Sequence, residues 1–125
     1  AMLYHGNNRE ILVRIATGGI DPRRSGEKVG AFFGQAAYLS PNFSKSDMYT
    51  DSSSSIKEKR PRTAERTVMV VRTVLGRPFS LKDGDVKRRY PEEGHDSVHG
   101  LPRDEGGCVD HREFMIYEKQ QMLPA

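Results

Sequence analysis

The stretch "TVMVVRTVLG", Thr67–Gly76, decides the fold class more than any other part of this chain of 125 residues. Its residues are mostly β-branched or apolar, few polar residues interrupt them, and a glycine ends the run. A run of this kind is typical of a central strand that is buried on both faces. The sequence therefore predicts a β-sheet with Thr67–Gly76 in its middle.

Further strands are predicted on both sides of this run. The residues of "EFMIYE" alternate, so that Phe114 and Ile116 share one face of a strand. Met115 and Tyr117 share the opposite face. Shorter strands are predicted at Leu3–His5, Ala36–Leu39 and His95–Gly100.

Two short helices are predicted in the first half of the chain. One of the two asparagines that open "NNREILVRIATGG", Asn7–Gly19, caps the first helix, and the glycine pair ends it. Ile11, Leu12 and Ile15 share one face of this helix. Ser40-Pro41 begins a second helix. Helices early in the chain and antiparallel strands later predict the α+β class.

The composition limits the class of protein. Only 35% of the residues are hydrophobic and 30% are charged, which suffices for one modest core, and we expect residues 1–125 to be a single domain excised from a longer protein. The formal net charge of +3 is less one-sided than in most nucleic-acid-binding domains. The single cysteine, Cys108, fits an intracellular protein, and no apolar run reaches the ~20 residues that cross a membrane.

Five motifs in a fixed order carry a family resemblance from Tyr4 to Pro124. They are "LYHG", "GAFFGQAAYLSPNFSKSDMY", "TVMVVRTVLGRPF", "GHDSVHG" and "REFMIYEKQQMLP". This series resembles the catalytic domain of the poly(ADP-ribose) polymerases, and the tankyrase branch is the most similar. The resemblance implies the ADP-ribosyltransferase fold, with two packed, mainly antiparallel β-sheets and short flanking helices. It also implies an enzyme that transfers ADP-ribose from NAD.

The same resemblance implies the catalytic residues. The family's His-Tyr-Glu triad is matched by His5, Tyr38 and Glu113. Cleavage of the nicotinamide glycosidic bond builds positive charge on the ribose. The Glu113 carboxylate suits that charge, and it can also orient an incoming hydroxyl group. His5 can hold a ribose hydroxyl of NAD.

The cofactor-binding residues implied by the resemblance surround the nicotinamide. Tyr38 and Tyr49 stack on its ring, which aromatic side chains do favourably. Ser46 donates its hydroxyl to the carboxamide, and the Gly6 backbone holds the same amide, since glycine permits close approach. Asn7 stands where the family often has a serine beside the adenine ribose. His5 completes this set, and no metal ion is expected.

Two further features concern neighbouring loops. The loop Ile20–Lys28 carries Arg23 and Arg24, which suit the adenosine and pyrophosphate side of NAD, although a solvated loop explains them equally well. The Ser-rich and basic stretch Thr50–Arg66 is predicted to be a loop. It has no cysteine, and so lacks the zinc site that tankyrases carry after the second tyrosine.

Three alternative functions stay open. A zinc-binding domain would use His95, His99, Cys108 and His111, but their spacing fits no common zinc motif. A nucleic-acid binder would use "KEKRPRTAER" and "KRRY", which lack interleaved aromatic residues. A catalytically inactive member would bind NAD or ADP-ribose only. The favoured interpretation is an enzyme that transfers single or multiple ADP-ribose units to a protein acceptor or to itself. We expect the domain to be monomeric and to lie in the nucleus or the cytoplasm.

Overall fold

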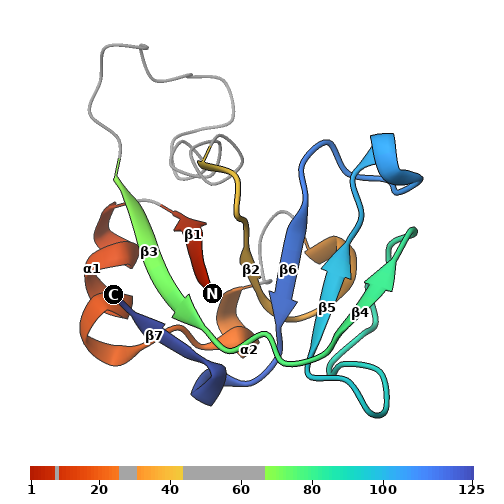
Figure 1. Ribbon diagram of the computed structural model, residues 1–125. Coiled ribbons are helices and arrows are strands. Elements are labelled where there is room, and N and C mark those ends of the chain that lie inside the picture. Colours follow the sequence, from red (N-terminus) through yellow and green to blue (C-terminus); the bar gives the residue numbers. More distant parts are fainter. Residues whose placement is uncertain (8, 26–30, 44–66) are drawn as a thin grey trace.

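The computed structural model describes residues 1–7, 9–25, 31–43 and 67–125. Two mainly antiparallel sheets lie side by side, and the helix α1, Arg9–Gly18, lies beside the first of them (Figure 1). Both chain termini lie in the half of the molecule that holds the three-stranded sheet. The predicted α+β class with two packed sheets and short helices is confirmed.

The three-stranded sheet has the order β1-β3-β7 and is antiparallel throughout. Its central strand, β3, confirms the strand predicted in Thr67–Gly76, but the predicted burial of both faces is wrong. Val71 and Thr73 are buried, whereas Val70 and Arg72 are exposed. The face with Val71 packs in the core, whereas on the opposite face the half-buried Tyr4 makes an edge contact with the Phe43 ring. The strands are β1 (Met2–Gly6), β3 (Val68–Thr73) and β7 (Met122–Pro124).

The four-stranded sheet has the order β2-β6-β5-β4. Its first two pairings are antiparallel, and β4 runs parallel to β5. The predicted strands at Ala36–Leu39, His95–Gly100 and Glu113–Glu118 are all present in shorter form, whereas β4 and β7 were not predicted. The strands are β2 (Ala37–Leu39), β4 (Pro78–Leu81), β5 (Ser97–Gly100) and β6 (Glu113–Ile116).

The helical segments are short. In α1, Leu12 is buried and Ile15 packs against the core, as predicted, and the helix is followed by Gly19 with a φ of 83°. A helical turn, α2 (Pro22–Ser25), lies in the stretch predicted to be a loop, because proline is preorganised for a first helical position. Three-residue 3-10 helices span Ala31–Phe33, Arg103–Glu105 and Lys119–Gln121. None of the described helices is long and apolar enough to span a membrane.

The predicted second helix lies mostly outside the described residues, as does the predicted loop Thr50–Arg66. The start of that helix has the expected contact: the Asn42 N–H donates a hydrogen bond to Ser40 Oγ at 3.0 Å. This is the bond that a serine makes when it caps a helix.

Two clusters of buried apolar side chains pack on the opposite faces of β6. Ile116 and Phe114 pack in the first cluster, between the two sheets, with Leu3, Leu39 and Val71. The second cluster covers the other face of the four-stranded sheet. It consists of Phe33, Ala36, Val98, Met115 and Tyr117. The predicted alternation in "EFMIYE" is therefore confirmed.

The two sheets are joined at their edges by one pair of backbone hydrogen bonds. The Tyr4 N–H donates to the Ser40 carbonyl at 2.8 Å, and the Ser40 N–H donates to the Tyr4 carbonyl at 3.0 Å. Tyr4 belongs to β1, an edge strand of the first sheet, and Ser40 directly follows β2, an edge strand of the second. Strands β1, β2 and β6 are therefore neighbours in space.

Truncation of the core between the sheets should lower stability strongly. Ile116→Ala removes a fully buried side chain, and we expect the free energy of unfolding to fall by about 2–5 kcal/mol. Leu123→Ala, on the exposed face of β7, should change it by less than about 0.5 kcal/mol. Urea denaturation followed by circular dichroism measures both values, and equal losses would contradict the assigned core.

Candidate active site

His5 lies in β1, beside the junction of the two sheets, and only 6% of its surface is exposed. Its Nδ1 atom is 3.1 Å from the Tyr38 carbonyl oxygen. Because a carbonyl only accepts hydrogen bonds, Nδ1 carries the hydrogen, and Nε2 is the acceptor nitrogen. Burial lowers the pKa of His5, and the bond to Tyr38 offsets part of this effect. His5 is therefore a neutral residue at pH 7.

The Tyr38 hydroxyl is held at both of its hydrogen-bonding positions. It donates to the Gly34 carbonyl at 2.7 Å and accepts from the Phe33 N–H at 2.8 Å. Burial raises the pKa of the Tyr38 hydroxyl well above its usual range, the bond from Phe33 opposes this rise, and the charge of Glu113 adds to it. The hydroxyl stays protonated, so Tyr38 offers an oriented aromatic ring and not a base.

Glu113 begins β6, and only 4% of its surface is exposed. Tyr38 pairs with Met115 across β2 and β6, so Glu113, two residues from Met115, shares the Tyr38 face of the sheet. The charge of Glu113 is the smallest of the three effects on the pKa of Tyr38, and it acts in the same direction as burial. The described geometry therefore joins His5 to the Tyr38 carbonyl and places Glu113 on the Tyr38 face of the neighbouring strand.

Gly100 pairs with Glu113 across β5 and β6. A side chain at this position would collide with the Phe33 ring, because a Cβ atom would lie 2.9 Å from it. The Phe33 ring therefore packs over Gly100 next to the buried carboxylate. Sequence reasoning missed this residue, since a glycine at a strand end carries no distinctive pattern.

Ser40 connects the strands that carry the three candidate catalytic residues. It is 2% exposed, its backbone bonds to Tyr4, and its hydroxyl donates to the Arg112 carbonyl at 2.9 Å. Arg112 directly precedes Glu113 in the chain. The sequence predicted Ser40 only as a helix cap, because contacts with residues far along the chain leave no local signal.

The remaining predicted NAD-binding residues are described in part. Gly6 is buried at the end of β1, and Asn7 follows it in a half-buried position. Both lie next to His5 in the chain, so they belong to the same region as the triad. Ser46 and Tyr49 lie outside the described residues.

Of the two arginines predicted to face the pyrophosphate of NAD, the structure describes the side chain of Arg23 alone. Its side chain is 86% exposed and lies 3.5 Å from the Asp21 carboxylate. Its carbonyl accepts a hydrogen bond from the Gln35 side chain, which ties α2 to the segment before β2. The side chain of Arg24 is outside the described part of the chain.

The four residues of the alternative zinc site have separate surroundings. His95 makes an edge contact with the Phe79 ring, His99 stacks on Phe114, and His111 contacts Asn42. Cys108 packs against the second core cluster. Within the described residues, no three His, Cys, Asp or Glu side chains gather in a way that could hold a metal ion. The described part of the chain therefore gives the zinc alternative no support.

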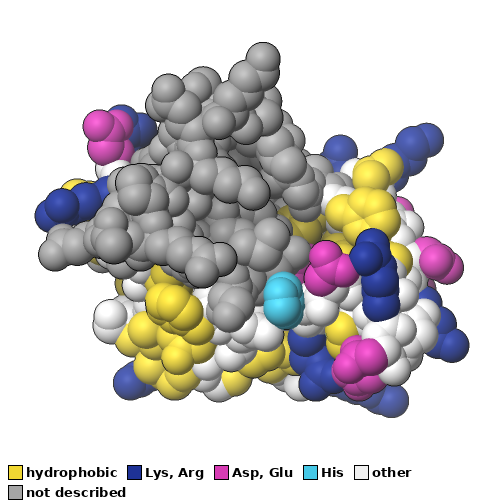
Figure 2. Space-filling view, turned by 90° about the horizontal axis from the view of Figure 1, so that it is seen from above, with side chains coloured by type: hydrophobic (Ala, Val, Ile, Leu, Met, Phe, Trp, Pro, Cys, Tyr) yellow, Lys and Arg dark blue, Asp and Glu magenta, His cyan; other side chains and the backbone are white. Residues whose placement is uncertain are grey.

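Charged side chains of both signs are interspersed on the described part of the face in Figure 2. Arg112 forms an ion pair with Glu105, and Arg103 pairs with Asp110 at 2.6 Å. A binder of nucleic acid would instead gather its basic residues in one patch or stripe. The stretch "KEKRPRTAER" lies outside the described residues, so that part of the nucleic-acid alternative stays a prediction. The described part of this face gives the alternative no support.

Comparison with known protein families assigns the chain. The model of the poly(ADP-ribose) polymerase catalytic domain matches residues 1–106. The chain belongs to this family, whose members use NAD as a substrate. The match includes His5 and Tyr38 and ends before Glu113, so the assignment of Glu113 depends on its motif and on its position beside Tyr38. Membership of the tankyrase branch stays a prediction.

Removal of the Ser40 hydroxyl should destabilise the site. Ser40→Ala leaves the Arg112 carbonyl without this donor and the Asn42 N–H without this acceptor. We expect the free energy of unfolding to fall by about 1–3 kcal/mol, as for other buried groups that lose a partner. Ser80→Ala is the matched control, because Ser80 is exposed and its contact with His99 is long, at 3.3 Å. Equal effects in urea denaturation would contradict the role of Ser40.

Acidification should destabilise the protein through His5. Burial lowers the pKa of His5 in the folded chain below 6.5, its value when exposed. At a pH between these two pKa values, His5 binds a proton in the unfolded chain and stays unprotonated in the folded chain. The free energy of unfolding therefore falls as the pH drops below 6.5, by up to about 1.4 kcal/mol per pH unit for one group.

The variant His5→Gln isolates this contribution. Urea denaturation from about pH 7 to about pH 5.5 should give a shallower loss of stability in His5→Gln than in the parent protein. The loss should not vanish, because burial and the Arg112 charge lower the pKa of His99 as well. If the free energy of unfolding fell equally steeply with pH in the two proteins, His5 would have the same pKa in the folded and in the unfolded chain.

Proposed function

We propose that this chain is the catalytic domain of an NAD-dependent ADP-ribosyltransferase. It cleaves the bond between nicotinamide and ribose, releases nicotinamide and transfers ADP-ribose to a protein acceptor or to itself. The observation that supports the proposal most is the hydrogen bond from His5 to the Tyr38 carbonyl, with Glu113 on the Tyr38 face of the neighbouring strand, in a chain of this family.

The role of Glu113 follows from the charge that develops during cleavage. The ribose of NAD becomes oxocarbenium-like as nicotinamide leaves. A carboxylate held close to that ring stabilises the positive charge, and burial strengthens the interaction because little water screens it. The same carboxylate can accept a hydrogen bond from the acceptor hydroxyl and orient it for attack. Glu113 permits both single additions and chain elongation.

His5 and Tyr38 have binding roles. Neutral His5 accepts a hydrogen bond at Nε2 from a ribose hydroxyl of NAD, since its Nδ1 is committed to the Tyr38 carbonyl. The Tyr38 ring stacks on nicotinamide, and its fixed hydroxyl lowers the cost of ordering the ring. Gly6 holds the carboxamide by its backbone, Asn7 takes the adenine-ribose side, and Ser46 and Tyr49 complete the nicotinamide site.

A family member that binds NAD without catalysis is the alternative. It would have the same binding residues, and it differs only in what happens to the glycosidic bond. The burial of Glu113 favours the enzyme, because burying a carboxylate costs free energy. A protein that only binds NAD has no developing cation for this carboxylate to stabilise.

Glu113→Gln separates the two functions. We expect this variant to lower ADP-ribose transfer about 100-fold or more, since the stabilised charge exists only in the transition state. Its Kd for NAD should change less than about threefold. The assay uses NAD labelled in the adenylate, with nicotinamide release measured in parallel.

Glu118→Gln is the matched control, because Glu118 is exposed and lies five positions further along the chain. It should retain parental transfer. An equal loss of transfer and of NAD binding in Glu113→Gln would contradict the assigned role. NAD binding without turnover in the parent protein would favour the non-catalytic alternative.

A further inference from the structure

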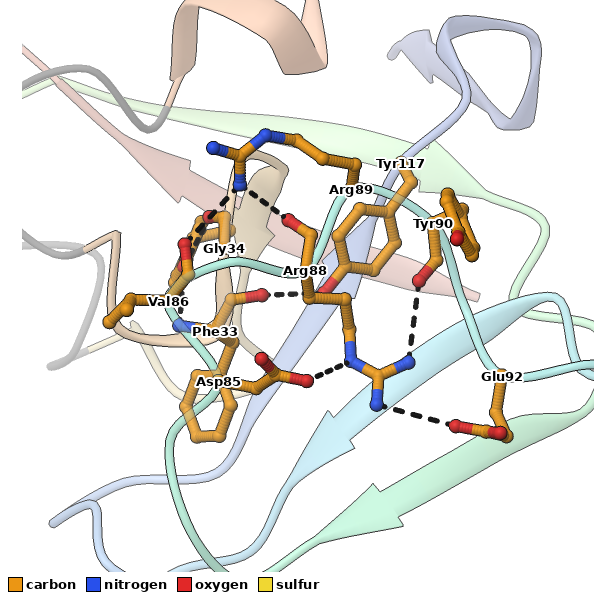
Figure 3. A network of polar contacts seen from close by, with 10 residues as sticks. Phe33, Gly34, Asp85, Val86, Arg88, Arg89, Tyr90, Glu92 and Tyr117 are labelled. Atoms are coloured by element: carbon orange, nitrogen blue, oxygen red, sulfur yellow. Dashed lines mark hydrogen bonds and ion pairs between the residues drawn. The ribbon is translucent and has the colours of Figure 1, made fainter.

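Arg88 is the centre of a polar network in the loop between β4 and β5 (Figure 3). Its side chain is 13% exposed, with Nε 3.1 Å from the Asp85 carboxylate and Nη2 3.4 Å from the Glu92 carboxylate. Nη1 donates to the Tyr90 carbonyl at 3.3 Å. We name Arg88 with these three partners the Arg88 clasp. A planar guanidinium with several partners is held more firmly than an exposed ion pair.

The backbone of Arg88 contacts the segment that leads into β2. Its carbonyl accepts a hydrogen bond from the Gln35 N–H at 3.0 Å. Gly34 lies against the same carbonyl with a φ of 92°, and a Cβ atom there would be only 2.1 Å from the Arg88 oxygen. The Asp85 N–H donates to the Phe32 carbonyl at 2.8 Å. The loop is therefore docked on residues 32–35.

The other side of residues 32–35 is held by two tyrosines. The Tyr38 hydroxyl bonds to Gly34 and Phe33. The Tyr117 hydroxyl donates to the Phe33 carbonyl at 2.6 Å, as Figure 3 shows. The Gln35 side chain donates to the carbonyl of Arg23 in α2. One turn thus connects the Arg88 clasp with Tyr38 and with α2.

We propose that Arg88 is a positioning residue for NAD binding. The Arg88 clasp fixes the Arg88 carbonyl, which contacts Gly34 and Gln35. Residues 32–35 in turn hold the Tyr38 ring and the adjoining α2. Arg88 acts through Tyr38 and makes no contact with NAD. The inference rests on the proposed function, because its effect is read as affinity for NAD.

Arg88→Gln tests the proposal by separating KM from kcat. We expect KM for NAD to rise about tenfold, because misplaced binding groups weaken binding. The value of kcat at saturating NAD should change less than about threefold, since the variant leaves the hydrogen bond from Ser40 to the Arg112 carbonyl, next to Glu113, in place. Lys87→Gln is the matched control, because it removes the same charge from an exposed neighbouring side chain and should change neither constant.

Two further variants distinguish positioning from a general loss of stability. Arg88→Lys keeps the charge but lacks the guanidinium fork, so it should restore KM only in part. The double variant Arg88→Gln/Tyr38→Phe tests whether the two residues act on the same turn. Its increase in KM should be smaller than the product of the increases in the two single variants, because both substitutions loosen residues 32–35. Independent effects, or a fall in kcat with an unchanged KM, would overturn the proposal.

Amide hydrogen exchange tests the same link without NAD. In Arg88→Gln, exchange at the Phe33 and Gln35 amides should speed up about tenfold, while Lys87→Gln stays at the parental rate. Unchanged exchange would overturn the positioning role even if NAD binding were confirmed. Faster exchange in Arg88→Gln, combined with a parent protein that binds no NAD, would instead overturn the proposed function, and with it the role of Arg88 toward NAD.

Discussion

The two backbone hydrogen bonds between Tyr4 and Ser40 are the constraint on which the site depends. They join β1 to the end of β2, and β2 pairs with β6. His5 belongs to one sheet, and Tyr38 and Glu113 belong to the other, so this junction brings the strands that carry them side by side. A pair of main-chain bonds is independent of side-chain identity, but Ser40 adds its hydroxyl to the same point and so links β6 as well.

Burial assigns different tasks to the three candidate catalytic residues. It keeps His5 neutral and Tyr38 protonated, and it places the Glu113 carboxylate where water screens it little. The hydrogen bonds of His5 and Tyr38 go to main-chain groups of the protein. These two side chains therefore hold fixed orientations before any substrate arrives, and preorganised groups need no rearrangement during the reaction.

The parts of the fold that could be predicted are those with strong local patterns. Residues Val68–Thr73 and the helix α1 combine propensity with periodicity, and the family motifs indicated His5, Tyr38 and Glu113. Strands β4 and β7 were missed because they have only four and three residues and each contains a proline. The exposed face of β3, the contacts of Ser40 and the space above Gly100 depend on residues distant in the chain, which no local pattern encodes.

The pairing of β2 with β6 also has a consequence for how the molecule assembles. Ala37 lies opposite Ile116, so β2 finds its antiparallel partner only when almost the whole chain is available. The same holds for β3, which pairs with both β1 and β7 near opposite ends of the chain. Contacts between such distant residues make folding slow, because a long loop must close before any pairing energy is gained. Strand β2 therefore stays without its β6 partner until Glu113–Ile116 has been synthesised.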